Sequence, residues 1–126
     1  MGIKVLVANR GEIACRILRA CNEAGHPTVA ICAPNDAGTL FTEMAEEVVL
    51  LEGETIGETY LNQDQIIQAA LSTGATAVHP GFGFLSERAD FARAVKSAGL
   101  VWIGPSAEAI EKMGDKMTAR QTMRAA

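Results

Sequence analysis

The chain has 126 residues, of which 48% are hydrophobic and 21% are charged, a balance typical of a soluble globular protein and unlike that of a disordered or collagen-like chain. This length suits one domain and excludes a large multi-domain assembly. Its apolar runs are far shorter than the roughly 20 residues of a membrane-spanning helix, and the first residues show no signal-peptide pattern. Three cysteines indicate reduced, buried thiols. We expect a cytoplasmic protein without membrane attachment.

The net charge of −4 conceals an uneven distribution of charge along the chain. No Lys or Arg occurs between Arg19 and Arg88, whereas ten Asp and Glu residues lie there. A nucleic-acid-binding protein needs Lys and Arg to displace counterions from phosphates, and an aromatic content of 5% offers few side chains for base stacking. The sequence therefore predicts no nucleic-acid partner.

The first thirty-odd residues predict a strand, a helix and a second strand. Residues 3–8 form a short apolar run rich in β-branched side chains, which is typical of a strand buried on both faces. Apolar residues then recur at helical spacing over residues 11–24, and Asn9 and Glu12 have the spacing of a capping box. Residues 27–32 repeat the strand pattern, so the unit predicts a right-handed parallel crossover.

The rest of the chain continues this alternation. We expect a turn at residues 34–38, strands at 48–51, 75–79 and 100–103, and helices at 41–47, 60–73, 86–97, 106–113 and 115–126. The pattern predicts an α/β fold, an open and mostly parallel sheet of about five strands with helices on both faces. Ligands collect at the carboxyl ends of the strands in such sheets, which draws attention to the loops at residues 9–12 and 80–87.

The loop after the first strand does not have the dinucleotide-binding pattern. That pattern, G-x-G-x-x-G, needs three glycines, and this loop has only Gly11. Arg10 and the backbone amides at the helix start could form an anion or carboxylate site. The alternative is that Arg10 pairs with an acidic neighbour while Glu12 caps the helix.

The loop after the fourth strand has two glycines, Gly81 and Gly83, on either side of Phe82. Glycines permit positive φ angles and the close approach of a ligand or another chain, which favours a binding role. The alternative is a tight turn in which Phe82 and Phe84 pack into the core.

The sequence indicates no metal site and no catalytic residue. His26 and His79 have no Cys, Asp or His at ligand spacing, and the cysteines have no partner His that would make a nucleophile. Lys116 is unusual because it follows Gly114 and Asp115 at the start of the last predicted helix, where a cation opposes the helix dipole. It either faces an anion or is a solvated lysine neutralised by Asp115.

Four motifs in register resemble the N-terminal domain of biotin carboxylase, the family found in acetyl-CoA, propionyl-CoA and pyruvate carboxylases. They are residues 8–17 (ANRGEIACRI), 79–87 (HPGFGFLSE), 103–105 (IGP) and 113–116 (MGDK). The resemblance covers residues 1–126 and implies a Rossmann-like domain that precedes an ATP-grasp domain. It implies an ATP-dependent ligase that activates bicarbonate and carboxylates biotin on a carrier protein.

The resemblance also implies roles for particular residues. Lys116 matches a lysine that contacts the nucleotide, and Arg19 and Glu23 match positions at the dimer interface of the bacterial subunit. The loop bordering the biotin site is matched by Gly81, Phe82, Gly83 and Glu87. The family often has Tyr at the position of Phe82, so a polar role of that side chain is not carried over.

The family uses ATP, Mg²⁺ and biotin, and its partners are bicarbonate, the biotinyl carrier protein and a carboxyltransferase subunit or domain. Its ATP lid, Mg²⁺-binding glutamates and biotin- and bicarbonate-binding arginines match nothing up to residue 126. We therefore expect a chain truncated before the ATP-grasp domain, a homodimer when complete, and an inactive fragment. One alternative is a free-standing, non-catalytic binding module of the same fold. Another is the equivalent domain of a related ATP-grasp ligase, such as a carbamoyl-phosphate or purine carboxylase.

Overall fold

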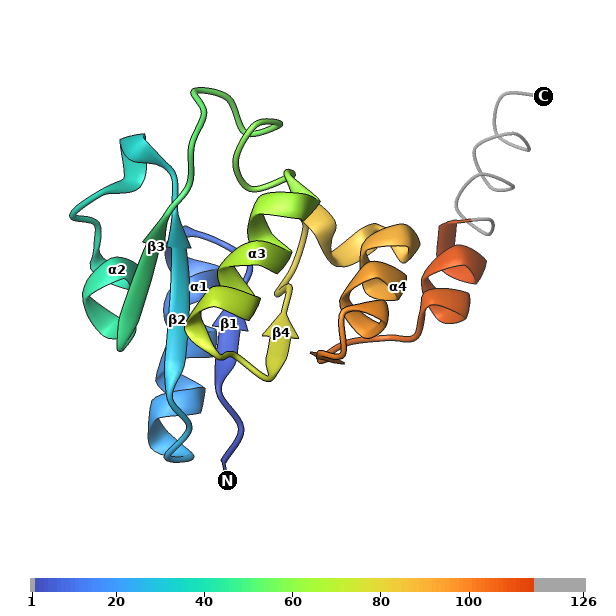
Figure 1. Ribbon diagram of the computed structural model, residues 1–126, viewed down its shortest axis with the longest axis horizontal. Helices are drawn as coiled ribbons and strands as arrows, with labels where there is room; N and C mark the ends of the chain where they lie inside the picture. The colour runs from blue at the N-terminus through green and yellow to red at the C-terminus, as the bar shows by residue number, and fades with distance from the viewer. Residues whose placement is uncertain (1, 115–126) are drawn as a thin grey trace.

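A computed structural model of the chain describes residues 2–114, which form a parallel sheet flanked by helices (Figure 1). The strands are β1 (Val5–Val7), β2 (Thr28–Cys32), β3 (Glu47–Leu50), β4 (Ala77–His79) and β5 (Val101–Trp102). The sheet is flanked by the α-helices α1 (Gly11–Glu23), α2 (Leu40–Met44), α3 (Gln63–Thr73) and α4 (Ala89–Ser97). Two 3₁₀ turns, η1 (Pro34–Asp36) and η2 (Phe84–Glu87), lie between these elements. A further helix includes residues 107–114.

The five strands of the described part lie in the order β3-β2-β1-β4-β5, and every neighbouring pair is parallel. β1 is central, with Leu6 opposite Val29 on one side and Val78 on the other. The chain therefore builds outward from β1 through β2 to β3, and then returns to add β4 on the other side of β1. The predicted open α/β sheet is confirmed.

The two faces of the sheet have separate cores because side chains alternate along each strand. Leu6 and Ala8 point to the face covered by α3 and α4. Val5 and Val7 point to the opposite face, where α1 and α2 pack. Figure 1 shows α1 behind the sheet and α3 in front of it. Both faces of β1 are covered, which explains why its sequence is an unbroken apolar run.

The predicted capping box at the start of α1 is wrong. The residue that caps α1 is Arg10, which makes no side-chain hydrogen bond to the helix. The Asn9 amide bonds elsewhere, and the Glu12 carboxylate lies 3.6 Å from Arg16 one turn further along the helix. The spacing was right for a cap, but Asn9 has tertiary partners and Glu12 lies beside a residue of its own helix.

Two other helices begin later than their apolar patterns predict. The helix expected over residues 60–73 begins at Gln63, because the Asn62 side chain accepts a hydrogen bond from the Gln65 N–H and caps it. The helix expected from residue 86 is divided into η2 and α4, which meet at Arg88. The Ser106 hydroxyl accepts a hydrogen bond from the Ala109 N–H at 3.1 Å, as expected for a helix cap. The predicted last helix, with Lys116, lies outside the described residues.

Candidate functional site

The strand order identifies one place where a ligand would be expected. In an open α/β sheet this is the crevice at the carboxyl ends of two neighbouring strands whose connections leave in opposite directions. Here those strands are β1 and β4, which pair with one another. The residues that follow them are 9–12 and 80–87, so the two loops selected from the sequence meet at this point.

The Asn9 side chain joins these two loops. Its Nδ2 donates hydrogen bonds to the carbonyl oxygens of Pro80 at 2.8 Å and Phe82 at 2.9 Å. Its Oδ1 accepts a hydrogen bond from the backbone N–H of Arg10 at 2.8 Å. The residue is 1% exposed, so water does not compete for these bonds. Sequence reasoning treated Asn9 as a helix cap and missed this role.

Gly81 lies tightly against the loop after β1 and has a φ of +69°. A Cβ on Gly81 would lie 2.8 Å from the Asn9 Nδ2 and 2.9 Å from the Ile13 Cγ2. The next residues also have positive φ angles, +74° at Gly83 and +48° at Phe84. Such a φ is strained for a bulky residue, so packing and hydrogen bonds must hold this loop in shape.

The two phenylalanines of the loop have opposite environments. Phe84 packs against the core and its ring lies 5.7 Å from that of Tyr60, measured between centroids, at an interplanar angle of 41°. Phe82 is 75% exposed. The tight-turn alternative therefore holds for Phe84 alone, and the loop presents Phe82 to its surroundings.

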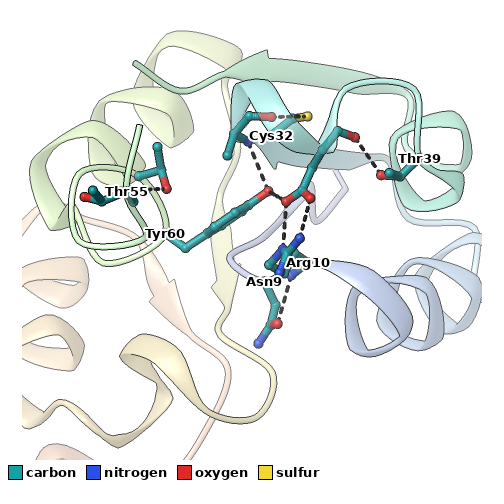
Figure 2. A network of polar contacts seen from close by, with 9 residues as sticks. Asn9, Arg10, Cys32, Thr39, Thr55 and Tyr60 are labelled. Atoms are coloured by element: carbon teal, nitrogen blue, oxygen red, sulfur yellow. Dashed lines mark hydrogen bonds and ion pairs between the residues drawn. The ribbon is translucent and has the colours of Figure 1, made fainter. Parts of the chain in front are cut away.

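Arg10 extends away from Asn9 into a second polar cluster, which Figure 2 shows. Its guanidinium bonds both carboxylate oxygens of Asp36, with Nε 2.7 Å from Oδ2. The Tyr60 hydroxyl donates to the same Oδ2 at 2.5 Å and accepts from the Ala33 N–H at 3.0 Å. The structure therefore supports the ion-pair alternative for Arg10.

The electrostatics of this cluster favour a charged Asp36 beside a protonated Tyr60. The hydrogen bond from Arg10 lowers the pKa of Asp36, burial opposes the shift, and the Tyr60 hydroxyl adds to the lowering. Burial raises the pKa of Tyr60, and the Asp36 carboxylate adds to that shift. Tyr60 thus remains a hydrogen-bond donor at neutral pH. The sequence marked Asp36 only as part of a turn.

His79 and the thiols have structural environments. The His79 Nδ1 accepts a hydrogen bond from the Gly81 N–H at 3.0 Å, and burial lowers the pKa of His79, which favours the neutral ring that can accept. Cys15, Cys21 and Cys32 are free thiols, and burial raises the pKa of Cys21 and of Cys32. Such thiols are poor nucleophiles.

The other residues that the sequence predicted for a site do not belong to the Asp36 cluster. Glu87 is exposed at the end of η2, and Arg19 and Glu23 are exposed on α1. Lys116 is outside the described residues. Within residues 2–114, no three His, Cys, Asp or Glu side chains are grouped so that they could hold a metal ion.

Comparison with known proteins identifies the family of this chain. The sequence model of the family "Biotin carboxylase, N-terminal domain" matches residues 1–110. The chain belongs to this family. It is 54% identical over 117 residues to the biotin-dependent acyl-coenzyme A carboxylase alpha3 subunit of Mycobacterium leprae, covering 93% of this chain and 20% of that protein. It is 49% identical over 123 residues to the biotin carboxylase of Pseudomonas aeruginosa, covering 98% and 27%.

Solved structures agree with this family assignment. A biotin carboxylase domain dimer of the Hydrogenobacter thermophilus 2-oxoglutarate carboxylase, in complex with MgADP, ADP and bicarbonate, matches with a TM-score of 0.88 and 46% identity. The match covers 99% of this chain and 27% of that one. The chain therefore spans only about a fifth to a quarter of the length of these three proteins. Among its described helices, none has the length and hydropathy to cross a membrane.

The contacts of Gly81 predict the effect of adding a methyl group there. Gly81→Ala combines left-handed backbone strain of about 1–2 kcal/mol with steric overlap that costs about 1–3 kcal/mol. We expect the free energy of unfolding in urea to fall by about 2–5 kcal/mol. Gly74→Ala is the matched control, because Gly74 has a φ of +76° with nothing near its Cβ position. Equal losses in the two variants would contradict the proposed tight fit.

The Asp36 cluster predicts a second effect. Hydrogen bonds to a charged group contribute about 1.5–3 kcal/mol each, but the Arg10 side chain is 43% exposed, so solvent weakens its bond to Asp36. We therefore expect Asp36→Asn to lower the free energy of unfolding by roughly 2–3 kcal/mol at pH 7. Asp90→Asn is the control, since Asp90 pairs with Arg88 on the surface and should contribute about 0.2–1 kcal/mol.

The same variant should change the pH dependence of stability. The pKa of Asp36 is lowered from its ordinary 3.8 in the folded state, so the unfolded chain binds the proton more readily. The stabilisation is complete above the unfolded pKa and is lost as the pH falls through the lower folded pKa. Urea unfolding should therefore show a steeper decline below about pH 5 in the unmodified protein than in Asp36→Asn. Parallel profiles would contradict this account.

Proposed function

We propose that this domain is the N-terminal part of an ATP-dependent biotin carboxylase. The reaction consumes ATP and bicarbonate and carboxylates biotin on its carrier protein, releasing ADP and phosphate. The family match over residues 1–110 carries the proposal. The neighbouring structure in complex with MgADP, ADP and bicarbonate supports the same substrates. In the complete enzyme, a carboxyltransferase subunit or domain would then transfer the carboxyl group from biotin to the final acceptor.

The loop at residues 81–87 is our candidate for the border of the biotin site. Its position at the carboxyl ends of β1 and β4 supports this role, as does the exposed aromatic side chain of Phe82. A phenyl ring offers an apolar face to a small bicyclic ligand without a hydroxyl hydrogen bond. Gly83 and Glu87 follow Phe82 in the same loop.

The exposed side chains of Arg19 and Glu23 are our candidates for an interface between two copies of the complete enzyme. They lie one turn apart on α1, so both can meet a symmetry-related helix. Within the described residues neither side chain has an ion pair or hydrogen bond, and the dimer among the neighbouring structures supports the idea.

The described residues do not fit a Mg²⁺ site, because no carboxylates are grouped for one. We therefore propose that metal binding and phosphoryl transfer belong to the rest of the enzyme, and that this domain alone is not catalytic. Phosphoryl transfer also needs cationic groups and a site closed to water. Lys116 is the nucleotide-contacting residue that the proposal assigns to this chain.

The proposal predicts ATP hydrolysis that requires both bicarbonate and biotin. We expect ADP release of this kind from the complete polypeptide that begins with this domain, and none from residues 1–126 expressed alone. Bicarbonate- and biotin-dependent turnover by residues 1–126 above that of a Lys116→Ala control would overturn the assignment. A gene that ends after codon 126 would favour the free-standing module instead.

Lys116 provides a separate test in the complete enzyme. A charge-assisted hydrogen bond to a nucleotide contributes about 1.5–3 kcal/mol, so Lys116→Gln should raise the apparent KM for ATP roughly 10- to 100-fold. The free energy of unfolding should not change. Lys112→Gln is the matched control, because Lys112 is an exposed lysine four positions earlier in the sequence. If both variants kept the ATP dependence of the unmodified enzyme, Lys116 would have no nucleotide role.

A further inference from the structure

The exposed ring of Phe82 makes little contact with its own domain, so packing does not fix its direction. At 75% exposure, its orientation depends on the backbone that carries it. That backbone is held on both sides of Gly81, where the Pro80 and Phe82 carbonyls accept hydrogen bonds from one buried amide group. The residue that supplies this amide therefore controls where Phe82 points.

We propose that Asn9 is a positioning residue for biotin binding, acting through the backbone of Phe82. The inference rests on the proposed function, in which the loop of Phe82 borders the biotin site. Asn9 itself is buried and would not touch the substrate. Its contribution is to keep the loop in the shape that presents an aromatic face.

The chemistry of the side chain explains why asparagine suits this position. Its amide has two N–H donors for the two carbonyls, and its oxygen accepts the Arg10 N–H at 2.8 Å. Asp would retain the acceptor but turn an oxygen toward two carbonyl oxygens. Gln would need room that Gly81 does not leave, since a Cβ at residue 81 would already lie 2.8 Å from the Asn9 Nδ2.

The backbone of the loop explains why a clamp is needed. Gly81, Gly83 and Phe84 all have positive φ angles. The two glycines adopt them without strain but leave the segment around Phe82 conformationally free, whereas the bulky Phe84 keeps its φ only because surrounding contacts determine it. The Tyr60 ring holds the loop at Phe84, and the Asn9 amide holds it at the other end. Without the amide, the segment that carries Phe82 keeps the Gly81 N–H bond to His79 and the Ser86 N–H bond to the Gly83 carbonyl, and neither joins it to the loop after β1.

The test measures steady-state kinetics of the complete enzyme with free biotin as the varied substrate. We expect Asn9→Asp to raise the KM for biotin about 5- to 10-fold, with kcat and the KM for ATP changed less than about 2-fold, because only binding of biotin is weakened. Phe82→Ala should raise the same KM. In the double variant, Asn9→Asp should add less than about 2-fold to the effect of Phe82→Ala, since one residue acts through the other.

Asn62→Ala is the matched control for a general loss of stability. It removes the helix cap of α3, and the hydrogen bonds of the Asn62 side chain go to Glu58 and Gln65 rather than to the loop, so the KM for biotin should not change. Hydrogen exchange of a peptide covering residues 80–85 gives a readout besides activity. Exchange should accelerate in Asn9→Asp and remain unchanged in Asn62→Ala. Asn9→Ser, which is too short to reach both carbonyls, replaces Asn9→Asp if the latter does not fold.

Three results would overturn the inference. Multiplying effects of Asn9→Asp and Phe82→Ala on the KM for biotin would show that Asn9 acts independently of the ring. Equal effects of Asn9→Asp and Asn62→Ala would reduce its role to stability. An unchanged KM in Phe82→Ala would show that this loop does not border biotin. A complete enzyme without any biotin-dependent turnover would instead refute the proposed function, and the inference would fail with it.

Discussion

The hydrogen bonds of two adjacent residues, Asn9 and Arg10, organise the carboxyl end of the sheet. Asn9 bonds the loop after β4, and Arg10 pairs with Asp36 in the turn after β2. The contacts then close into a ring, because Asp36 accepts the Tyr60 hydroxyl and the Tyr60 ring packs on Phe84 in the same β4 loop. Four segments that are distant in the sequence thus fix one another at the point where the strand order reverses.

This arrangement requires the central strand to be buried on both sides. β1 is short, with three residues, and all of them are buried. Its backbone is paired with β2 and β4 in parallel register. The direction in which the chain leaves β1, through Ala8 to Asn9, is therefore largely fixed. The buried amide of Asn9 can therefore act as a rigid reference for the β4 loop, while Arg10 faces the neighbouring turn from the start of α1.

The order and type of the elements could be predicted from local patterns, whereas the contacts of the site could not. Apolar runs identified the five strands, and helical spacing identified the helices. Burial on both faces explains the runs of β1 and β2, whereas β3 and β5 at the two edges of the sheet are partly or largely exposed. The resemblance of residues 8–17 and 79–87 to one family identified the loop of Phe82. The tertiary partners of the Asn9, Asp36 and Tyr60 side chains lie 24 to 73 positions away, and no local spacing encodes such pairs. Asn9 shows the difficulty well: its distance from Glu12 fits a helix cap, but a buried tertiary bond replaces that cap.

The ring of contacts that holds the loop of Phe82 also ties this loop to distant parts of the family domain. Within the described structure, the hydrogen bonds and ring contacts that shape this loop come from residues 9 to 86. They join the loop to the ends of β1 and β2 and to the segment before α3. Relatives of this chain include carboxylases named for acyl-coenzyme A, pyruvate and 2-oxoglutarate. This one family domain thus stands within proteins of different composition, of which the chain spans between 10% and 27%.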